Sequence, residues 1–137
     1  MKRKISNNYL LSSQSLSHCS LYSHYFDSSS NLIFNKIDDY INIDIILNSH
    51  IRILVSGIYI INIVLDTDND ITICCTVNKN IIEDTITKSN KINDNEYHLI
   101  CYTLLKLEQG DILNINSFNN NNIKHNCNIS IMHIGNF

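Results

Sequence analysis

The sequence predicts an all-β domain, an antiparallel sandwich of about nine to ten short strands. Three observations lead to this prediction. From Leu32 onward, runs rich in Ile and Val alternate with clusters of Asn, Asp and Ser at the regular spacing of sandwiches and barrels. The length of 137 residues suits one domain. The chain is 44% hydrophobic and 17% charged, which is enough apolar material for a core and too much for a disordered chain.

The composition is strongly skewed and indicates an AT-rich genome. The chain has 26 Ile and 22 Asn, but no Ala, Pro or Trp. Asn tolerates the left-handed backbone region, so we expect it to replace Gly and Pro in turns. The three glycines that remain are then expected where a side chain would not fit.

The first strands are short. "NLIFNKI" (31–37) is the first, and "YINIDIIL" (40–47) is the second, with apolar residues at alternate positions Ile41, Ile43 and Ile45. "HIRILVS" (50–56) is the third, and "GIYIINIVL" (57–65) is the fourth and a long one. The polar run "DTDND" (66–70) then forms a turn.

The middle of the chain continues the pattern. "ITICCTV" (71–77) and "IIEDTIT" (81–87) are strands joined by a tight turn at "NKN", and residues 88–96 are a loop. "YHLICYTLLKL" (97–107) could be a helix, but Tyr, Ile, Cys and Thr favour strands. Its alternation of Leu99, Cys101, Thr103, Leu105 and Leu107 also indicates a strand.

The ends of the chain differ. "EQGD" (108–111) is a turn, "ILNINSF" (112–118) a strand, 119–126 a polar loop, and "CNISIMHIG" (127–135) the last strand. Residues 1–30 are rich in Ser, Asn, Tyr and His, without a clear period. We therefore expect 1–30 to be a polar arm, flexible or ordered by a partner, and 31–137 to be the single folded domain.

Four local patterns occur in a specific order: "SGIYIINI", "ITICCTVNKNII", "LLKLEQGDILNI" and the closing "NISIMHIG". In this order they resemble the complement 1q and tumour-necrosis-factor-like family of jelly rolls. The similarity is greatest to the carboxyl-terminal globular domains of bacterial exosporium or viral collagen-like proteins. It covers residues 32–137. This chain departs from the family in having fewer aromatic residues and no collagen repeat before the domain.

Three residues are expected to shape turns. Gly110 should have a positive φ in the turn between two inner strands, and Asp111 should accept hydrogen bonds from turn amides. Gly57 should open the long strand where a neighbouring strand or chain passes close.

The resemblance implies a homotrimer with apolar side chains along the threefold axis. Both alternating sets of 57–65 and of 97–107 are apolar, and strands of this kind are usually covered on both faces. Which set faces the core and which the interface stays open at this stage. The residues expected at core or interface are Ile58, Tyr59, Ile60, Ile61, Ile63, Ile100, Tyr102, Leu104, Leu105, Leu107, Leu113 and Ile115.

Patterns for chemistry are weak. The five cysteines have no CxxC spacing, which disfavours zinc. Cys74 and Cys75 should point to opposite faces of a strand, so we consider an interchain disulfide involving Cys75 and Cys19. His18, Cys19 and His24 could hold a metal only if the arm folded. The carboxylates of 66–70 lack the Gly and Glu of a calcium loop. We predict no cofactor, no metal and no catalytic residue.

The predicted function is non-enzymatic: a self-assembling structural or surface-decorating protein of a spore outer layer or virus particle. A soluble ligand that binds a receptor, or a small carbohydrate-binding module, are the alternatives; the absence of Trp counts against the latter. The net charge of −3 and scattered lysines argue against nucleic acid. No apolar run spans a membrane. "MKRK" is followed by polar residues, so we expect no signal peptide and assembly inside a cell.

Overall fold

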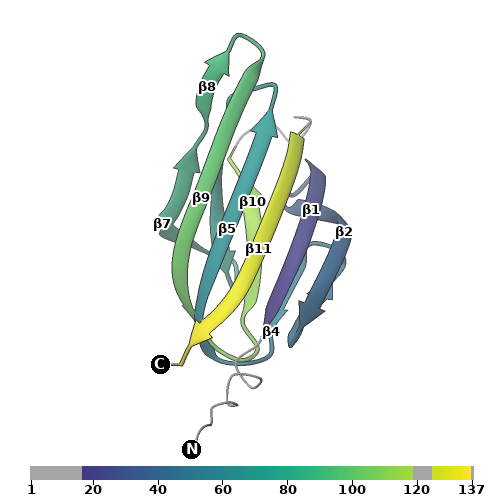
Figure 1. Ribbon diagram of the computed structural model, residues 1–137, viewed down its shortest axis with the longest axis vertical. Coiled ribbons are helices and arrows are strands. Elements are labelled where there is room, and N and C mark those ends of the chain that lie inside the picture. The colour runs from purple at the N-terminus through teal and green to yellow at the C-terminus, as the bar shows by residue number, and fades with distance from the viewer. Residues whose placement is uncertain (1–16, 119–124, 137) are drawn as a thin grey trace, which may run out of the picture.

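The computed structural model describes residues 17–118 and 125–136. These residues form eleven strands and no helix. The strands make two antiparallel sheets packed face to face, and Figure 1 shows the six-stranded sheet in front of the other. The predicted all-β antiparallel sandwich is therefore confirmed.

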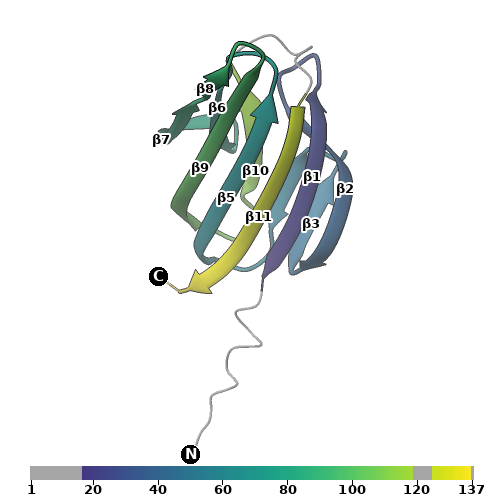
Figure 2. The same cartoon turned by 45° about the horizontal axis from the view of Figure 1, so that its top comes forward.

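The six-stranded sheet has the order β2-β1-β11-β5-β9-β8. Its strands are β1 (His18–Phe26), β2 (Leu32–Ile41), β5 (Gly57–Thr67), β8 (Asn90–Asn93), β9 (Glu96–Leu107) and β11 (His125–Gly135). The five-stranded sheet has the order β3-β4-β10-β6-β7. Its strands are β3 (Ile43–Ile46), β4 (His50–Ile53), β6 (Thr72–Val77), β7 (Asn80–Lys88) and β10 (Ile112–Ser117). The turned view in Figure 2 shows β3 behind β1 and β2.

The core lies between the two sheets. Strand β5 alternates without a break from Gly57 to Leu65, with buried residues at odd positions and half-buried residues at even positions. Because successive side chains of a strand point to opposite faces, the odd positions all enter the sandwich. They meet fully buried residues of the opposite sheet, including Ile51, Ile73 and Leu113.

The predicted arm is wrong for residues 18–26, which form β1. This strand pairs with β11 on one side and β2 on the other, and buries Cys19 and Leu21 in the core. Its inward position 23 is a serine whose hydroxyl lies 3.3 Å from Nε2 of the buried His125. Because this inward set includes a serine, the strand lacked the apolar period that marks the others. The folded domain thus begins before residue 31, and residues 1–16 lie outside the described part of the chain.

A second difference is β8, which lies in the expected loop 88–96. All four of its residues are exposed, and it pairs only with β9 at the edge of the sheet. An edge strand with no buried face gives no hydrophobic pattern to detect. The other strands fall close to their expected ranges, although the last begins at His125, inside the expected polar loop; residues 119–124 of that loop are outside the described part.

The expected use of Asn in turns is confirmed. Asn42, Asn48 and Asn78 all have positive φ angles, between 52° and 56°. Asn78 and Lys79 (φ 70°) form the two-residue turn between the paired Val77 and Asn80. Positive φ at both central residues is what a tight hairpin turn of this kind requires.

Candidate functional site

The outward face of the six-stranded sheet carries a group of apolar side chains on three neighbouring strands, which we name the apolar stripe. Five of its members are about half exposed or more, with Tyr102 at 65% and Leu104 at 57%. Exposed apolar groups gathered in this way mark interaction surfaces in soluble proteins. The stripe comprises Ile58, Ile60 and Val64 of β5, Ile100, Tyr102 and Leu104 of β9, and Met132 and Ile134 of β11.

Strand register makes the stripe contiguous. Ile60 of β5 lies opposite Leu104 of β9 on one side and opposite Met132 of β11 on the other. Val64 lies opposite Ile100 in the same way. Cross-strand neighbours on one face are close enough for their side chains to contact. Asn62 interrupts the apolar side chains of β5, but it lies opposite Tyr102, so the stripe continues along β9.

The structure assigns each residue expected at core or interface to one side. The inward set is fully buried: Tyr59, Ile61, Ile63, Leu107, Leu113 and Ile115. Leu105 is partly buried and packs against that core. The outward set is Ile58, Ile60, Ile100, Tyr102 and Leu104. Which set faces the core, a question that the sequence left open, is therefore settled by which face meets the second sheet.

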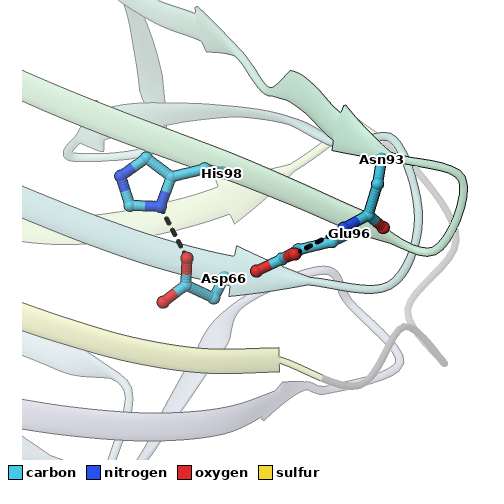
Figure 3. Close-up of polar contacts among 4 residues, drawn as sticks. All are labelled: Asp66, Asn93, Glu96 and His98. Carbon is cyan, nitrogen blue, oxygen red and sulfur yellow. Dashed lines mark hydrogen bonds and ion pairs between the residues drawn. The ribbon is translucent and has the colours of Figure 1, made fainter.

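The stripe ends in polar groups beyond Val64 and Ile100. Figure 3 shows His98 of β9 facing Asp66 of β5, with 2.5 Å between Nδ1 and Oδ1. Nearby, Asn93 donates its side-chain amide to Glu96 over 2.8 Å. One end of this sheet face is thus charged and hydrogen-bonded, while its middle is apolar.

Gly57 begins β5 at a point where the adjacent strand leaves no room for a side chain. A Cβ at this position would lie 2.0 Å from Nε2 of His133 and 2.5 Å from the carbonyl oxygen of Gly135. The imidazole of His133 stacks on Tyr59 with ring centroids 5.0 Å apart, and Nε2 lies 2.7 Å from that same carbonyl oxygen. The expected close approach of a neighbouring strand is confirmed, and that strand is β11.

Gly110 and Asp111 form the turn between β9 and β10. Gly110 has the expected positive φ, 94°, and its amide donates to the carbonyl of Ile53 over 2.8 Å. The carboxylate of Asp111 accepts the amide of Glu108 at one oxygen and the side-chain amide of Asn78 at the other. Both roles are structural, as predicted.

The considered interchain disulfide between Cys19 and Cys75 is wrong for this structure. Cys19 is 1% exposed and Cys75 is fully buried, and both are free thiols inside the sandwich. Burial raises the pKa of each of these thiols to about 12. Cys74 points to the opposite face, as a strand requires, but it is also covered, at 1% exposure. Neither Cys19 nor Cys75 is placed to meet a second chain.

The candidate metal residues are not brought together. Cys19 points into the core, and of its two histidine neighbours His24 is exposed. Across the described residues, no three His, Cys, Asp or Glu side chains gather as ion ligands. The carboxylates of the 66–70 turn serve different partners: Asp66 faces His98, and Asp70 accepts the hydroxyl of Ser89 over 2.7 Å.

A cavity of about 630 Å³ is lined by Asp66, His24 and His125. It is an open depression between strand ends. No membrane-crossing helix, long and apolar enough for that purpose, occurs in the segments that the structure describes.

Comparison with known proteins identifies the fold of this chain. No family model and no curated protein matches the sequence. Among solved structures, the globular domain of zebrafish complement 1qA protein aligns with a TM-score of 0.70 at 12% identity, over 89% of this chain and 99% of that one. Murine APRIL aligns with 0.61 at 10% identity, over 84% and 98%. Eiger TNF from S. frugiperda aligns with 0.59 at 10% identity, over 87% and 95%. The chain therefore has the jelly-roll fold of the complement 1q and tumour-necrosis-factor proteins.

Proposed function

We propose that this protein is a non-enzymatic module that self-assembles as a homotrimer and serves as a structural or surface-decorating component of a spore outer layer or virus particle. The observation that carries the assembly is the apolar stripe. The site of action follows from the sequence resemblance to spore and virus surface proteins.

The stripe gives a free-energy reason to assemble. Fully burying one Ile, Leu or Met side chain stabilises by about 1.5–3 kcal/mol. Several such side chains are half exposed on one sheet face, with Ile100 at 56% and Met132 at 51%. Covering them therefore lowers the free energy and acts against the entropy lost on association.

A second copy of the chain is the simplest partner for burying the apolar stripe. The described residues contain no helix that could fold over this face. Homo-oligomers close by rotational symmetry, so identical stripes can meet around one axis. The sequence resemblance implies threefold symmetry, and the polar groups around Asp66 and His98 then lie where the apolar contact ends.

A soluble receptor-binding ligand is the second candidate, and the likeness to APRIL and to Eiger TNF favours it equally. Both functions use the same assembly and differ in what the assembled surface meets. Their separation needs localisation: labelling on intact particles or spores supports the first function, and release into the medium supports the second.

Light scattering on the purified protein tests the assembly. The wild type is expected at three times the monomer mass at micromolar concentration, with and without reductant, because the thiols are buried. Tyr102→Asp places a charge in the stripe and should give monomers. Lys106→Gln changes an exposed residue opposite Ile58 on the same sheet face but introduces no charge, so this variant should remain trimeric. A wild type that stays monomeric at micromolar concentration contradicts the proposal.

A further inference from the structure

A polar groove lies on the outward face of the five-stranded sheet. It has a volume of about 340 Å³ and continues into a second depression of about 300 Å³, with which it shares His50, Lys79 and Asn114. These volumes lie in the range of small-molecule sites, about 300–1,000 Å³. We name this feature the outer groove.

The floor of the outer groove consists of small polar side chains from adjacent strands. Asn114 of β10 lies opposite Thr76 of β6, and Asn116 lies opposite Cys74. Outward side chains on such a sheet are ordinarily solvated, yet Asn114 is 6% exposed and Thr76 is 8% exposed. The floor is therefore recessed below its surroundings.

Hydrogen bonds within the protein use most of the donors of the floor. Nδ2 of Asn114 donates to the carbonyl oxygen of Ser49 over 3.0 Å. The hydroxyl of Thr76 donates to Oδ1 of Asn116 over 2.9 Å, and Nδ2 of Asn116 donates to Oδ1 of Asn31 over 2.7 Å. Because a carbonyl oxygen only accepts, the contact with Ser49 fixes the Asn114 amide, and its Oδ1 has no protein partner among the described residues. The floor thus presents acceptors, which match hydroxyl donors of a ligand.

The rim of the outer groove carries basic groups, in contrast to the acceptors of its floor. Lys79 is exposed, and among the described residues its ammonium forms no ion pair. The imidazole of His50 is held through Nδ1 by the hydroxyl of Ser49, 2.6 Å away, which leaves Nε2 for a ligand. Among the residues that the structure describes, no carboxylate lines either part of the groove, although the whole chain has more acidic than basic residues. The local charge therefore favours an anionic group at this end.

The walls supply apolar contact. Ile81 and Phe118 are 49% and 52% exposed and flank the polar floor. A sugar ring presents an apolar face as well as hydroxyl groups, and a phenyl ring can cover that face without Trp. The absence of Trp, which counts against a sugar-binding module on sequence grounds, does not exclude contact of this kind.

We propose that the outer groove binds an acidic saccharide: its hydroxyl groups donate to Asn114 and Thr76, and its carboxylate lies beside Lys79 and His50. The groove is on the side of the sandwich opposite to the apolar stripe, so self-assembly through the stripe leaves it open. An assembled protein would then present one groove per copy, and weak single sites would add up to high avidity on a glycan-coated surface.

Nuclear magnetic resonance titration of the full chain tests the site, with glucuronic acid and glucose as a matched pair that differs in the carboxylate. Glucuronic acid is expected to shift the amide signals of Thr76, Asn114 and Ile81. Glucose should bind about fivefold more weakly, the contribution expected of an exposed charge pair. Raising the salt concentration should reduce the difference between the two sugars.

Two lysine variants provide the control. Lys79→Asn removes the charge and keeps a residue that suits a φ of 70°, so the turn should fold normally. It should reduce glucuronic acid binding about fivefold and leave glucose binding unchanged, while Lys91→Asn on β8 should change neither.

Three results overturn the proposal: equal binding of the two sugars, shifts confined to other surfaces, or tighter binding of free glutamate than of glucuronic acid. The last result would identify an amino-acid site. All these readouts are independent of oligomeric state, so failure here is distinct from failure of the trimer.

Discussion

The two outward faces of the sandwich contrast sharply, although the two inward faces are alike. The six-stranded sheet turns Ile, Leu, Tyr and Met outward along β5, β9 and β11. The five-stranded sheet turns Asn, Thr and Cys outward along β6 and β10. Inside, both sheets contribute fully buried Ile and Leu to one core. The outward surfaces are thus free to differ once the core is satisfied.

The difference shows how each face treats desolvation. Removing the apolar side chains of the stripe from water lowers the free energy. Burying the polar side chains of the outer groove raises the free energy, unless each one finds a hydrogen-bond partner. Asn114 and Asn116 already have protein partners, so their recessed position is stable in a single chain. A partner surface would therefore stabilise the apolar stripe, whereas the outer groove is stable without one.

The largest expected effect comes from placing a charge in the apolar stripe. Ile60→Asp puts a carboxylate between Leu104 and Met132, which would bury it without a partner in the assembly. We expect at least a thousandfold loss of assembly affinity, about 4.1 kcal/mol.

Ile81→Asp is the matched change on the other sheet, at a residue that is 49% exposed. It should leave the mass of the assembly unchanged in analytical ultracentrifugation. Equal loss in both variants would remove the contrast between the faces.

The next effect concerns the fit of β5 against β11. Gly57→Ala inserts a methyl group that must displace both His133 and the backbone at Gly135. We expect a loss of about 2–4 kcal/mol in the free energy of unfolding, measured by urea denaturation.

Gly110→Ala is the control on the side of the five-stranded sheet. Nothing lies within 4 Å of a Cβ there, so only the φ of 94° opposes the change. The expected loss is about 1 kcal/mol. A Gly110 variant that loses more than the Gly57 variant contradicts this account.

A third prediction tests whether the inward faces of the two sheets bury their cysteine thiols to a similar degree. Burial raises the pKa of Cys19 and Cys127 in one sheet, and of Cys75 in the other, from 9.0 to about 12. Between these values the unfolded chain loses thiol protons that the folded chain keeps. Stability should therefore be unaffected by these thiols below pH 9 and should fall as pH rises toward 12, by about 1.4 kcal/mol per thiol at pH 10.

Urea denaturation between pH 8 and pH 10.5 measures this slope. Cys19→Ala and Cys75→Ala should each flatten it by a similar amount, whatever they do to stability at pH 8. The native thiols should also resist a thiol reagent at pH 8. Rapid modification of the folded protein would show that one face of the core is open.

The smallest effect concerns exposed ion pairs. Arg52 and Asp44 on the five-stranded sheet are 2.6 Å apart but almost half exposed. Arg52→Gln should cost about 0.5 kcal/mol or less, and less still at high salt. Asp66→Asn, at the polar end of the stripe, should alter assembly more than Arg52→Gln does. Equal effects on the sedimentation profile would mean that Asp66 lies away from the contact.

The sequence was sufficient where one local pattern dominates. The alternation of "GIYIINIVL" located β5, and the same reasoning distinguished β9 from a helix. A glycine before an aspartate in "EQGD" located a turn with a positive φ because few other residues adopt that backbone angle. The sequence was insufficient for two strands. In β1 the inward Ser23 interrupts the apolar pattern, and in β8 the exposed residues Asn90–Asn93 have no such pattern.

The sequence by itself determined an all-β fold, most strand positions, the turn role of Gly110 and the fact that both faces of β5 are apolar. Only the tertiary structure decided that Tyr59 faces the core and Ile60 the surface, that Cys19 is buried, and that Asn114 joins Thr76 and His50 in one groove. The physical reason is that periodicity records which residues share a face of one strand. Which face is covered, and which distant strands lie side by side, depends on pairing between segments far apart in the chain.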